Sequence, residues 1–430
     1  MHDRTETVEA LWADFASPIR TAEDYVNSLR GRRMNVFFMG ERVPEPVEHA
    51  VIRPSINAMA ETYRLATEQP DLATVHSGIS DRRINRFLHV PVSPGELVAK
   101  HEMQRELGRR TGTCFQRCVG LDAIGSCHSV TFDIDDKHGG EYHRRFLAFL
   151  ERAQAANVVI GGAMTDPKGD RSKPPHQQRD ADLFLHVVRR DHKGLYVSGA
   201  KMHQTGAVNS HWLIFMPTMR LTEADRDWAV VGAVRVDAPG LTYIVGRQTN
   251  DTRIVDGGAM DAGNAQFAGQ ESLIVFDEVF VPHEHVFMDG EWAYASSLVE
   301  RFTTYHRSSY VCKTGLGDVL IPRSQLCYGR FPDRSPDLPK LCWEARDERC
   351  YRVQRDTGAT SRVRISTFDQ FRAPALAISN AVRTRRSRLP RCGRAWPARR
   401  HPRHGFLTPS PHWHAARNSA AVGSPRTTCA

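Results

Sequence analysis

The sequence lacks any apolar run long enough to cross a membrane. Such a helix needs about 20 consecutive, predominantly apolar residues, and no run of this kind occurs among the 430 residues. The N-terminal stretch MHDRTETVEALWADF is acidic and lacks the apolar centre of a secretory signal. These two absences predict a soluble, cytoplasmic protein that has no membrane partner.

Cysteine is scarce before residue 322, where only four are found, and five more are scattered after it. Four thiols in a cytoplasmic chain indicate ligation or burial, not a disulfide framework. Cys114 and Cys118 in TGTCFQRCVG have neither the spacing of a redox dithiol nor that of a zinc ribbon. We expect a helix here, in which positions i and i+4 share one face. The two thiols then hold part of a metal site, or they are two small buried residues.

Positive charge is concentrated in the last quarter of the chain, although the net charge of the whole is +9. Residues 1–321 carry 36 Lys+Arg and 42 Asp+Glu, a net of −6, whereas residues 322–430 carry 22 and 7, a net of +15. The later segment has 11 prolines, Lys340 as its one lysine, and no sustained period. Its composition fits a disordered nucleic-acid-binding arm, an unusual domain, or out-of-frame translation of GC-rich DNA, and favours the last. We expect an irregular tail and no nucleic-acid partner.

Hydrophobic periodicity divides the rest of the chain into three parts. Residues 1–155 have helical periods, and Thr21 with Asp24 forms a capping box. Residues 156–290 contain seven short β-rich runs separated by Gly, Asp and Pro, which predicts one antiparallel β domain. Residues 291–321 return to a helical pattern. This order predicts an α+β fold, followed by the aberrant tail of residues 322–430.

Four more motifs carry side chains suited to chemistry. The run YHRSSYVCK adds His306 and Cys312, which would complete a four-ligand set for an iron–sulfur cluster or for zinc; alternatively, His306 is a hydrogen-bonded core histidine. The run AMTDPKGDRSKPP offers donors to an anionic or heterocyclic ligand, or is a polar turn. The run GAKMHQTGAVNSHW has donors and acceptors that suit the edge of a flavin, or is a polar hairpin. Glu271, beside an apolar strand, is a candidate general base or a solvated edge residue.

Taken together, these motifs resemble the flavin and iron–sulfur 4-hydroxybutyryl-CoA dehydratases, which also isomerise vinylacetyl-CoA. The resemblance extends from about residue 20 to residue 321 and rests on RPSINAMAETY, TGTCFQRCVGLDA, GAMTDPKGDR, GAKMHQTGAVNSH, FAGQESLIVFDEVFVP and VERFTTYHRSSY. It implies a fold like that of the acyl-CoA dehydrogenases, with an N-terminal helical domain, a central β domain and a C-terminal helical bundle. It also implies a homotetramer, FAD, a [4Fe–4S] cluster and an acyl-CoA substrate. The flavin-dependent 4-hydroxyphenylacetate 3-hydroxylases of the same superfamily are the alternative.

The resemblance implies roles for individual residues. The metal ligands match Cys114, Cys118, His306 and Cys312. The catalytic positions match Gln116, Glu271, Tyr310, Lys313 and His306, of which Glu271 is the candidate acid/base. The flavin-binding segments match Met164, Thr165, Asp166, Pro167, Lys168, Gly169, Asp170, Arg171, His203, Gln204 and Thr205. The implied reaction is dehydration of 4-hydroxybutyryl-CoA to crotonyl-CoA.

Two features depart from the family pattern. Five residues separate His306 from Cys312, where the family has six. In an unbroken helix this spacing turns Cys312 roughly 120° away from His306, and a π-bulge or an early helix end would restore the approach. The tail of residues 322–430 does not resemble the family's C-terminal helical bundle. We therefore expect this chain to be unstable or inactive, with 322–430 disordered or frameshifted.

Overall fold

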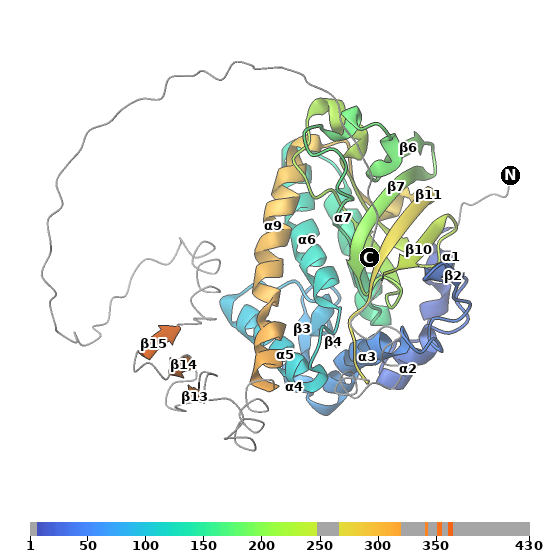
Figure 1. Cartoon of the computed structure of the whole chain (residues 1–430). Coiled ribbons are helices and arrows are strands. Elements are labelled where there is room, and N and C mark those ends of the chain that lie inside the picture. Colours follow the sequence, from blue (N-terminus) through green and yellow to red (C-terminus); the bar gives the residue numbers. More distant parts are fainter. Residues whose placement is uncertain (1–6, 247–265, 320–339, 343–350, 355–359, 364–430) are drawn as a thin grey trace, which may run out of the picture. The chain divides into compact units, whose positions relative to one another are not determined.

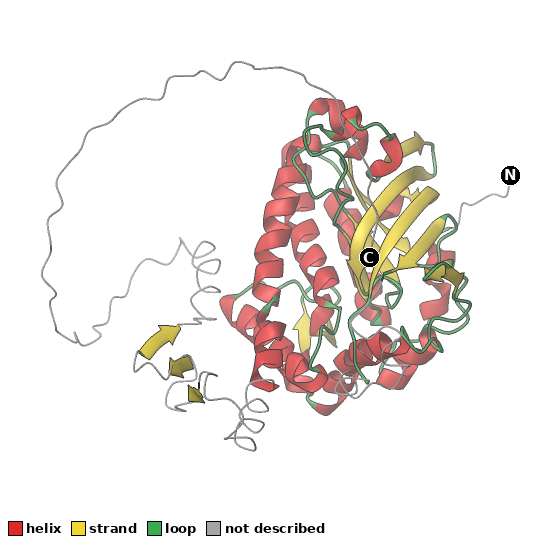
Figure 2. Cartoon of the chain, in the orientation of Figure 1, coloured by secondary structure: helices red, strands yellow, loops and turns green. Residues whose placement is uncertain are grey.

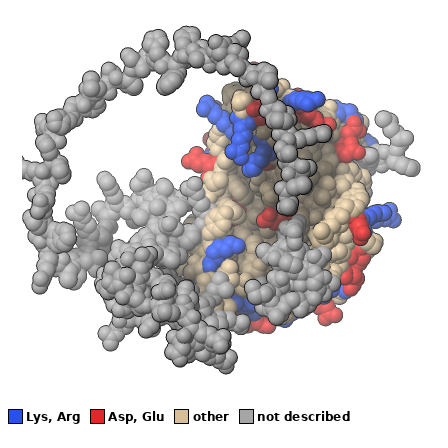
Figure 3. Space-filling model, viewed as in Figure 1, with Lys and Arg blue, Asp and Glu red and all other residues tan. Residues whose placement is uncertain are grey.

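The computed structural model describes residues 7–246, 266–319, 340–342, 351–354 and 360–363. The chain divides into two units, Met1–Ala381 and Val382–Ala430, and the second lies outside the described residues. Within the described residues, no helix is both long and apolar enough to cross a membrane. Basic and acidic side chains both occupy the face shown in Figure 3, in line with the small net charge before residue 322.

Helices make up most of the chain before residue 157. The expected capping box is present, because the Thr21 hydroxyl accepts from the Asp24 N–H while the Asp24 carboxylate accepts from the Thr21 N–H. The helices are α1 (Val8–Trp12), α2 (Ala22–Ser28), α3 (Arg53–Glu68), α4 (Pro70–Ala73), α5 (Pro94–Thr111), α6 (Cys118–His138) and α7 (Tyr142–Ala156). This region also contains strands that the helical pattern did not predict, namely β1 (Val36–Phe38), β2 (Glu41–Arg42), β3 (Thr74–Ser77) and β4 (Arg82–Asn85).

All seven β-rich runs of the sequence form strands. They are β5 (Ile160–Ala163), β6 (His186–Arg190), β7 (Gly194–Thr205), β8 (Trp212–Phe215), β9 (Val230–Arg235), β10 (Leu241–Val245) and β11 (Glu271–Pro282), and β12 (Val286–Asp289) follows. One sheet has the order β2-β1-β10-β11-β7-β6 and the other has the order β12-β9-β8-β5.

The prediction of an antiparallel β domain is wrong for two strand pairs. The strands form two sheets, and each sheet contains one parallel pair, β1 with β10 and β5 with β8. Between β5 and β8 the chain leaves for the other sheet, where it builds β6 and β7, and then returns. A long connection of this kind permits parallel pairing, whereas a short hairpin enforces antiparallel pairing.

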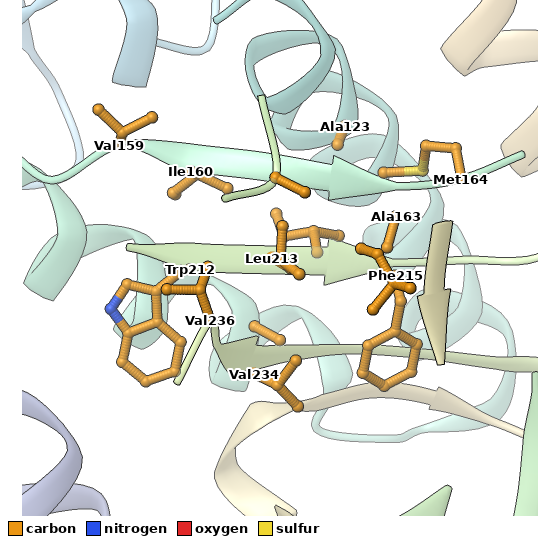
Figure 4. Close-up of a cluster of buried hydrophobic side chains, with 14 of the residues drawn as sticks. Ala123, Val159, Ile160, Ala163, Met164, Trp212, Leu213, Phe215, Val234 and Val236 are labelled. Carbon is orange, nitrogen blue, oxygen red and sulfur yellow. The ribbon is translucent and has the colours of Figure 1, made fainter. Parts of the chain in front are cut away.

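The core lies between the sheets and the helices that cover the smaller sheet. Figure 4 shows Ile160, Leu213, Phe215 and Val234 of this sheet packed together, with Ala123 of α6 beside them. Close approach of helix and strand requires a glycine in α6, because a Cβ at Gly120 would lie 1.8 Å from a backbone carbonyl oxygen of β5. Helix α6 is therefore held directly against the sheet.

Helices α6, α7 and α9 (Ala295–Ser309) lie side by side next to the sheets (Figures 1 and 2). Helices α6 and α9 are antiparallel. Tyr305 packs on Gly125, and Arg301, which comes earlier in α9, pairs with Asp133, which comes later in α6. A turn at Tyr310 ends α9, and residues 311–319 are helical again.

The described parts of the tail contain more regular structure than its composition predicts. The strands β13 (Lys340–Cys342), β14 (Tyr351–Gln354) and β15 (Thr360–Val363) form a three-stranded antiparallel sheet. Aromatic and β-branched residues lie in β14 and β15, and such residues favour extended backbone even where no long period is present. The remainder of residues 322–430 lies outside the described residues.

Candidate functional site

The cysteine pair stands in a loop, and the expected helix begins only at its second member. Helix α5 ends at Gly112, whose φ of 58° forms a left-handed C-cap, and α6 starts at Cys118. Between them, Gln116 also has a positive φ of 66°, so the backbone cannot continue as a right-handed helix through CFQRC. The prediction of two thiols on one helical face is therefore wrong.

Three thiols nevertheless converge at the start of α6. Hydrogen bonds to Cys114 and Cys312 raise the pKa of the buried Cys118 thiol well above its ordinary value. The pKa of Cys114 is lowered to about 6, chiefly by the hydrogen bond with Cys118 and also by the positive charge of Lys313, while burial and the charge of Glu271 oppose this. The pKa of Cys312 is likewise lowered by its bond with Cys118. The structure thus brings three predicted ligands together, close to Lys313 and Glu271.

The turn at Tyr310 is what allows Cys312 to reach this site. It separates α9 from the helical residues 311–319, and the Lys313 N–H donates to the Tyr310 carbonyl there. The second helical segment packs tightly on α5, since a Cβ at Gly108 would lie 2.2 Å from the Cys312 carbonyl oxygen. The expected early helix end is thus present, and Cys312 lies next to Cys118.

His306 lies farther along the same helix pair. Its Nδ1 is 3.0 Å from Oδ2 of Asp122, a fully buried carboxylate one turn after Cys118 in α6. The imidazole stacks on Phe302, with ring centroids 5.4 Å apart, and meets the edge of the half-exposed Tyr310 ring at 4.9 Å. The structure therefore places His306 against Asp122, and no hydrogen bond in the described part of the chain joins it to the thiols.

Asp122 is the residue at this site that the sequence motifs did not reveal. Its Oδ1 accepts from Nζ of Lys100 at 3.1 Å and from the hydroxyl of Ser309 at 2.7 Å. The available signal was its position four residues after Cys118, which places it on the same face of α6.

The donor set suits a soft metal, but its arrangement is not that of a single-ion site. Among the described residues, no group of three or more His, Cys, Asp or Glu side chains is arranged to hold one metal ion. The thiols here are hydrogen-bonded to one another. Thiolates that hold an iron–sulfur cluster bind different irons, so they need to share a region and not a single coordination sphere. The three thiols lie together at the start of α6, and His306 lies one turn away beside Asp122, so the donor types fit that requirement in kind.

The side chain of Gln116 hydrogen-bonds to three distant segments of the chain. Its Nε2 donates to the carbonyl oxygens of Ser55 and Ala268 at 2.9 and 3.0 Å, and its Oε1 accepts from Asn209 at 3.1 Å. Both ends of this fully buried amide are thus used within the protein.

Glu271 begins β11 and pairs with Thr205 at the end of β7. The Thr205 hydroxyl donates to its Oε1 at 3.4 Å, and Nδ1 of His203 lies 3.7 Å from its Oε2. The Glu271 side chain is half exposed, so solvent or a bound molecule can reach its carboxylate. Two of the flavin-matching residues therefore lie beside the candidate acid/base.

Side chains of β7 hydrogen-bond to the loop that follows β5. Nζ of Lys201 donates to Oδ1 of Asp166 at 2.6 Å and to the carbonyl oxygens of Met164 and Met216 at 3.1 and 2.8 Å. Oε1 of Gln204 accepts from the Met164 N–H at 2.8 Å. These bonds occupy the inner side of the loop, whereas its exposed residues are Thr165, Lys168, Gly169, Asp170 and Arg171, with Pro167 partly exposed.

Comparison with known proteins identifies relatives across this region. The family model described as "4-hydroxyphenylacetate 3-hydroxylase N terminal" matches residues 21–288. The 4-hydroxybutyryl-CoA dehydratase/vinylacetyl-CoA-Δ-isomerase of Clostridium aminobutyricum is 48% identical over 312 residues, covering 72% of this chain and 64% of that protein. The chain thus spans less than two thirds of the length of this relative.

Solved structures give the same result. An oxygen-tolerant archaeal 4-hydroxybutyryl-CoA dehydratase from N. maritimus matches with a TM-score of 0.71 and 60% identity, covering 74% of this chain and 64% of that one. The oxygenase component of a 4-hydroxyphenylacetate 3-monooxygenase, solved with FAD, shares the mixed α+β fold with a TM-score of 0.60 and 20% identity, covering 72% and 64%. The family match over residues 21–288, supported by these similarities, shows that the chain belongs to the 4-hydroxyphenylacetate 3-hydroxylase family.

Proposed function

We propose that this chain carries the flavin and iron–sulfur site of a 4-hydroxybutyryl-CoA dehydratase, which forms crotonyl-CoA and isomerises vinylacetyl-CoA. The identities of 48% and 60% to dehydratases, against 20% to the hydroxylase of known structure, favour this branch of the family. The observation that carries the proposal is the convergence of Cys114, Cys118 and Cys312 beside Glu271 and Lys313. An aromatic hydroxylase that uses only flavin and oxygen has no need for three converging thiols.

The cluster would be held by these three thiolates and by His306. Hydrogen bonds join Cys118 to both neighbouring thiols, and the bond to Cys114, with the positive charge of Lys313, lowers the pKa of Cys114. Thiolates, not thiols, bind iron, so this electrostatic environment suits the ligand role.

FAD would be held by the loop of residues 164–171 and by His203, Gln204 and Thr205. Lys201 and Gln204 brace the inner side of that loop, which leaves the backbone of its exposed residues available for an anionic or heterocyclic ligand. When bound, FAD supplies one-electron chemistry, and the cluster supplies a Lewis-acid iron for the departing hydroxyl.

The protein's own part in the reaction is to bind the acyl-CoA and to move protons. The hydrogen on C2 is the acidic one, because the thioester carbonyl delocalises the charge that its removal leaves. A base must therefore stand at C2, and Glu271, half exposed and close to Cys114, is assigned to this exchange through its carboxylate oxygens. The cation of Lys313 favours negative charge in the same place. Tyr310, Gln116 and His306 are assigned to the surroundings of the substrate.

The remaining proposals concern architecture and assembly. Residues 1–155, 156–290 and 291–321 would correspond to the N-terminal helical domain, the central β domain and the start of the C-terminal bundle in an acyl-CoA dehydrogenase-like homotetramer. Since residues 322–430 are not expected to supply that bundle, cofactor content is a more direct test of the site than turnover.

The test is anaerobic reconstitution of the full chain with iron, sulfide and FAD. We expect about four irons and four sulfides per chain, as for one [4Fe–4S] cluster, together with one flavin. Cys118→Ala should lose the iron, whereas Cys127→Ala should retain it, because Cys127 is buried in α6 away from the three thiols. Conversion of 4-hydroxybutyryl-CoA is followed by mass spectrometry. Flavin without iron, and hydroxylation of 4-hydroxyphenylacetate by reduced flavin and oxygen, would support the hydroxylase alternative.

A further inference from the structure

Three donors from two helices converge on one buried carboxylate. Asp122 on α6 is fully buried, and its Oδ1 accepts from Nζ of Lys100 and from the hydroxyl of Ser309. Its Oδ2 lies 3.0 Å from Nδ1 of His306. The carboxylate thus links α5, α6 and α9 at a single position.

The protonation pattern of His306 follows from these contacts. Lys100 is almost fully buried, and its ammonium group donates to Oδ1 of Asp122 at 3.1 Å, so the two groups form a buried carboxylate–ammonium pair. An ionised carboxylate only accepts hydrogen bonds, so the Nδ1 of His306 must carry a proton to bind it. In the neutral ring, Nε2 is then left with a free lone pair, which is the form of imidazole that binds a metal.

The contact between Asp122 and His306 lies one helical turn from Cys118. Cys118 precedes Asp122 by one turn of α6, so the two side chains share a face. From the facing segment, Cys312 hydrogen-bonds to Cys118, whereas His306 and Ser309 hydrogen-bond to Asp122. The imidazole and the thiols therefore lie along one seam between α6 and the α9 region.

A second buried polar group lies along the same seam. Gln104 is fully buried, and within the described part of the chain neither atom of its amide has a hydrogen-bond partner. It lies one turn from Lys100 and one turn from Gly108 on the face of α5 that contacts Asp122 and Cys312. Burying an amide without a hydrogen-bond partner costs free energy of folding, so we expect a polar group opposite this face of α5.

We propose that Asp122, held by Lys100 and Ser309, is a positioning residue that fixes the tautomer of His306 and presents its Nε2 to the iron–sulfur site. This inference rests on the proposed function, because that function assigns His306 to the cluster. Carboxylate–histidine–metal arrangements recur in proteins, where the outer partner sets the ring orientation and the basicity of the ligand.

Asp122→Asn reverses the polarity of this contact while keeping the size of the side chain. Lys100 and Ser309 are both donors, so the amide oxygen must face them and the amide N–H must face His306. Nδ1 then has to accept, and the ring proton moves to Nε2, where it blocks metal binding. The control is Asp133→Asn, which removes a different carboxylate of α6 that pairs with Arg301 of α9.

The first measurement needs no cofactor. In the full chain labelled with ¹⁵N-histidine, NMR should show the Nδ1–H tautomer of His306 in the wild type and in Asp133→Asn, and the Nε2–H tautomer in Asp122→Asn. His306→Gln identifies the signal. A wild-type protein with the Nε2–H tautomer would overturn the proposal, even if the Asp122→Asn protein does not fold.

The second measurement separates this inference from the proposed function. After reconstitution, the Mössbauer component of one iron, about a quarter of the signal, should shift or disappear in Asp122→Asn and persist in Asp133→Asn. Identical spectra in Asp122→Asn and wild type would contradict the positioning role while leaving the cluster in place. A wild-type chain that takes up no iron and sulfide would contradict the proposed function, and the tautomer measurement would still decide the role of Asp122.

Discussion

Replacing Lys201 by Met should destabilise the protein by about 3 kcal/mol, because it leaves a buried carboxylate without its charge partner. The Lys201 side chain is 2% exposed. Its ammonium group donates hydrogen bonds to Asp166 and to two carbonyl oxygens. Removing one partner of a buried ion pair costs about 3–5 kcal/mol. The lower end applies, since the N–H and hydroxyl of Thr218 still donate to Oδ2 of Asp166.

Urea unfolding followed by tryptophan fluorescence measures this loss. The double variant Lys201→Met/Asp166→Asn removes both charges, so it should be clearly more stable than the single variant. Since Lys201 also fixes the Met164 carbonyl, the single variant should weaken FAD binding more than the change in folding stability explains. The reasoning would be refuted by a single variant within about 0.5 kcal/mol of wild type, or by a double variant no more stable than the single one.

Three further predictions concern other parts of the fold. Burial lowers the pKa of His285 to about 3, so protonation of this residue favours the unfolded state as pH falls below about 6.5. Between pH 6.5 and pH 5 the wild type should lose about 1.6 kcal/mol more free energy of unfolding than His285→Phe in urea titrations, and equal losses would exclude this. In the apo-protein, Cys114 should react with iodoacetamide at pH 7 before Cys127, because burial raises the pKa of Cys127 to about 12. Mass spectrometry that finds Cys127 modified first would contradict the assigned environments. Gly120→Ala should unfold the protein or lower its melting temperature by several degrees, because the new Cβ meets a β5 carbonyl. Gly78→Ala, with open space around it, should lower the melting temperature much less. Similar melting curves for both variants would refute the packing of α6 on β5.

Local patterns in the sequence predicted local structure well. The β-rich runs separated by Gly, Asp and Pro located seven of the eight strands described between residues 156 and 290. The 3.6-residue period located α3, α5, α7 and α9. The capping box at Thr21 was also readable, because its two hydrogen bonds join residues three apart. The expected functional residues gave the family through their order along the chain, and the comparisons support that family.

Contacts between distant segments were not readable in the same way. The helix expected through CFQRC is absent, since Gln116 is held at positive φ while its amide joins Ser55, Ala268 and Asn209. The strand pattern did not reveal two sheets with parallel pairs, because a periodic run specifies its faces and not its neighbours.

The sequence by itself determined most helices, seven strands of the β domain and the kinds of residue present at the site, including the unusual interval between His306 and Cys312. The tertiary structure alone decided that Cys312 reaches Cys118, since this depends on the turn at Tyr310 and on the packing of residues 311–319 against Gly108 of α5. It alone revealed Asp122 as the partner of His306 across 184 positions. Periodicity arises from the geometry of one segment, whereas a site is assembled by packing between segments that the chain brings together only on folding.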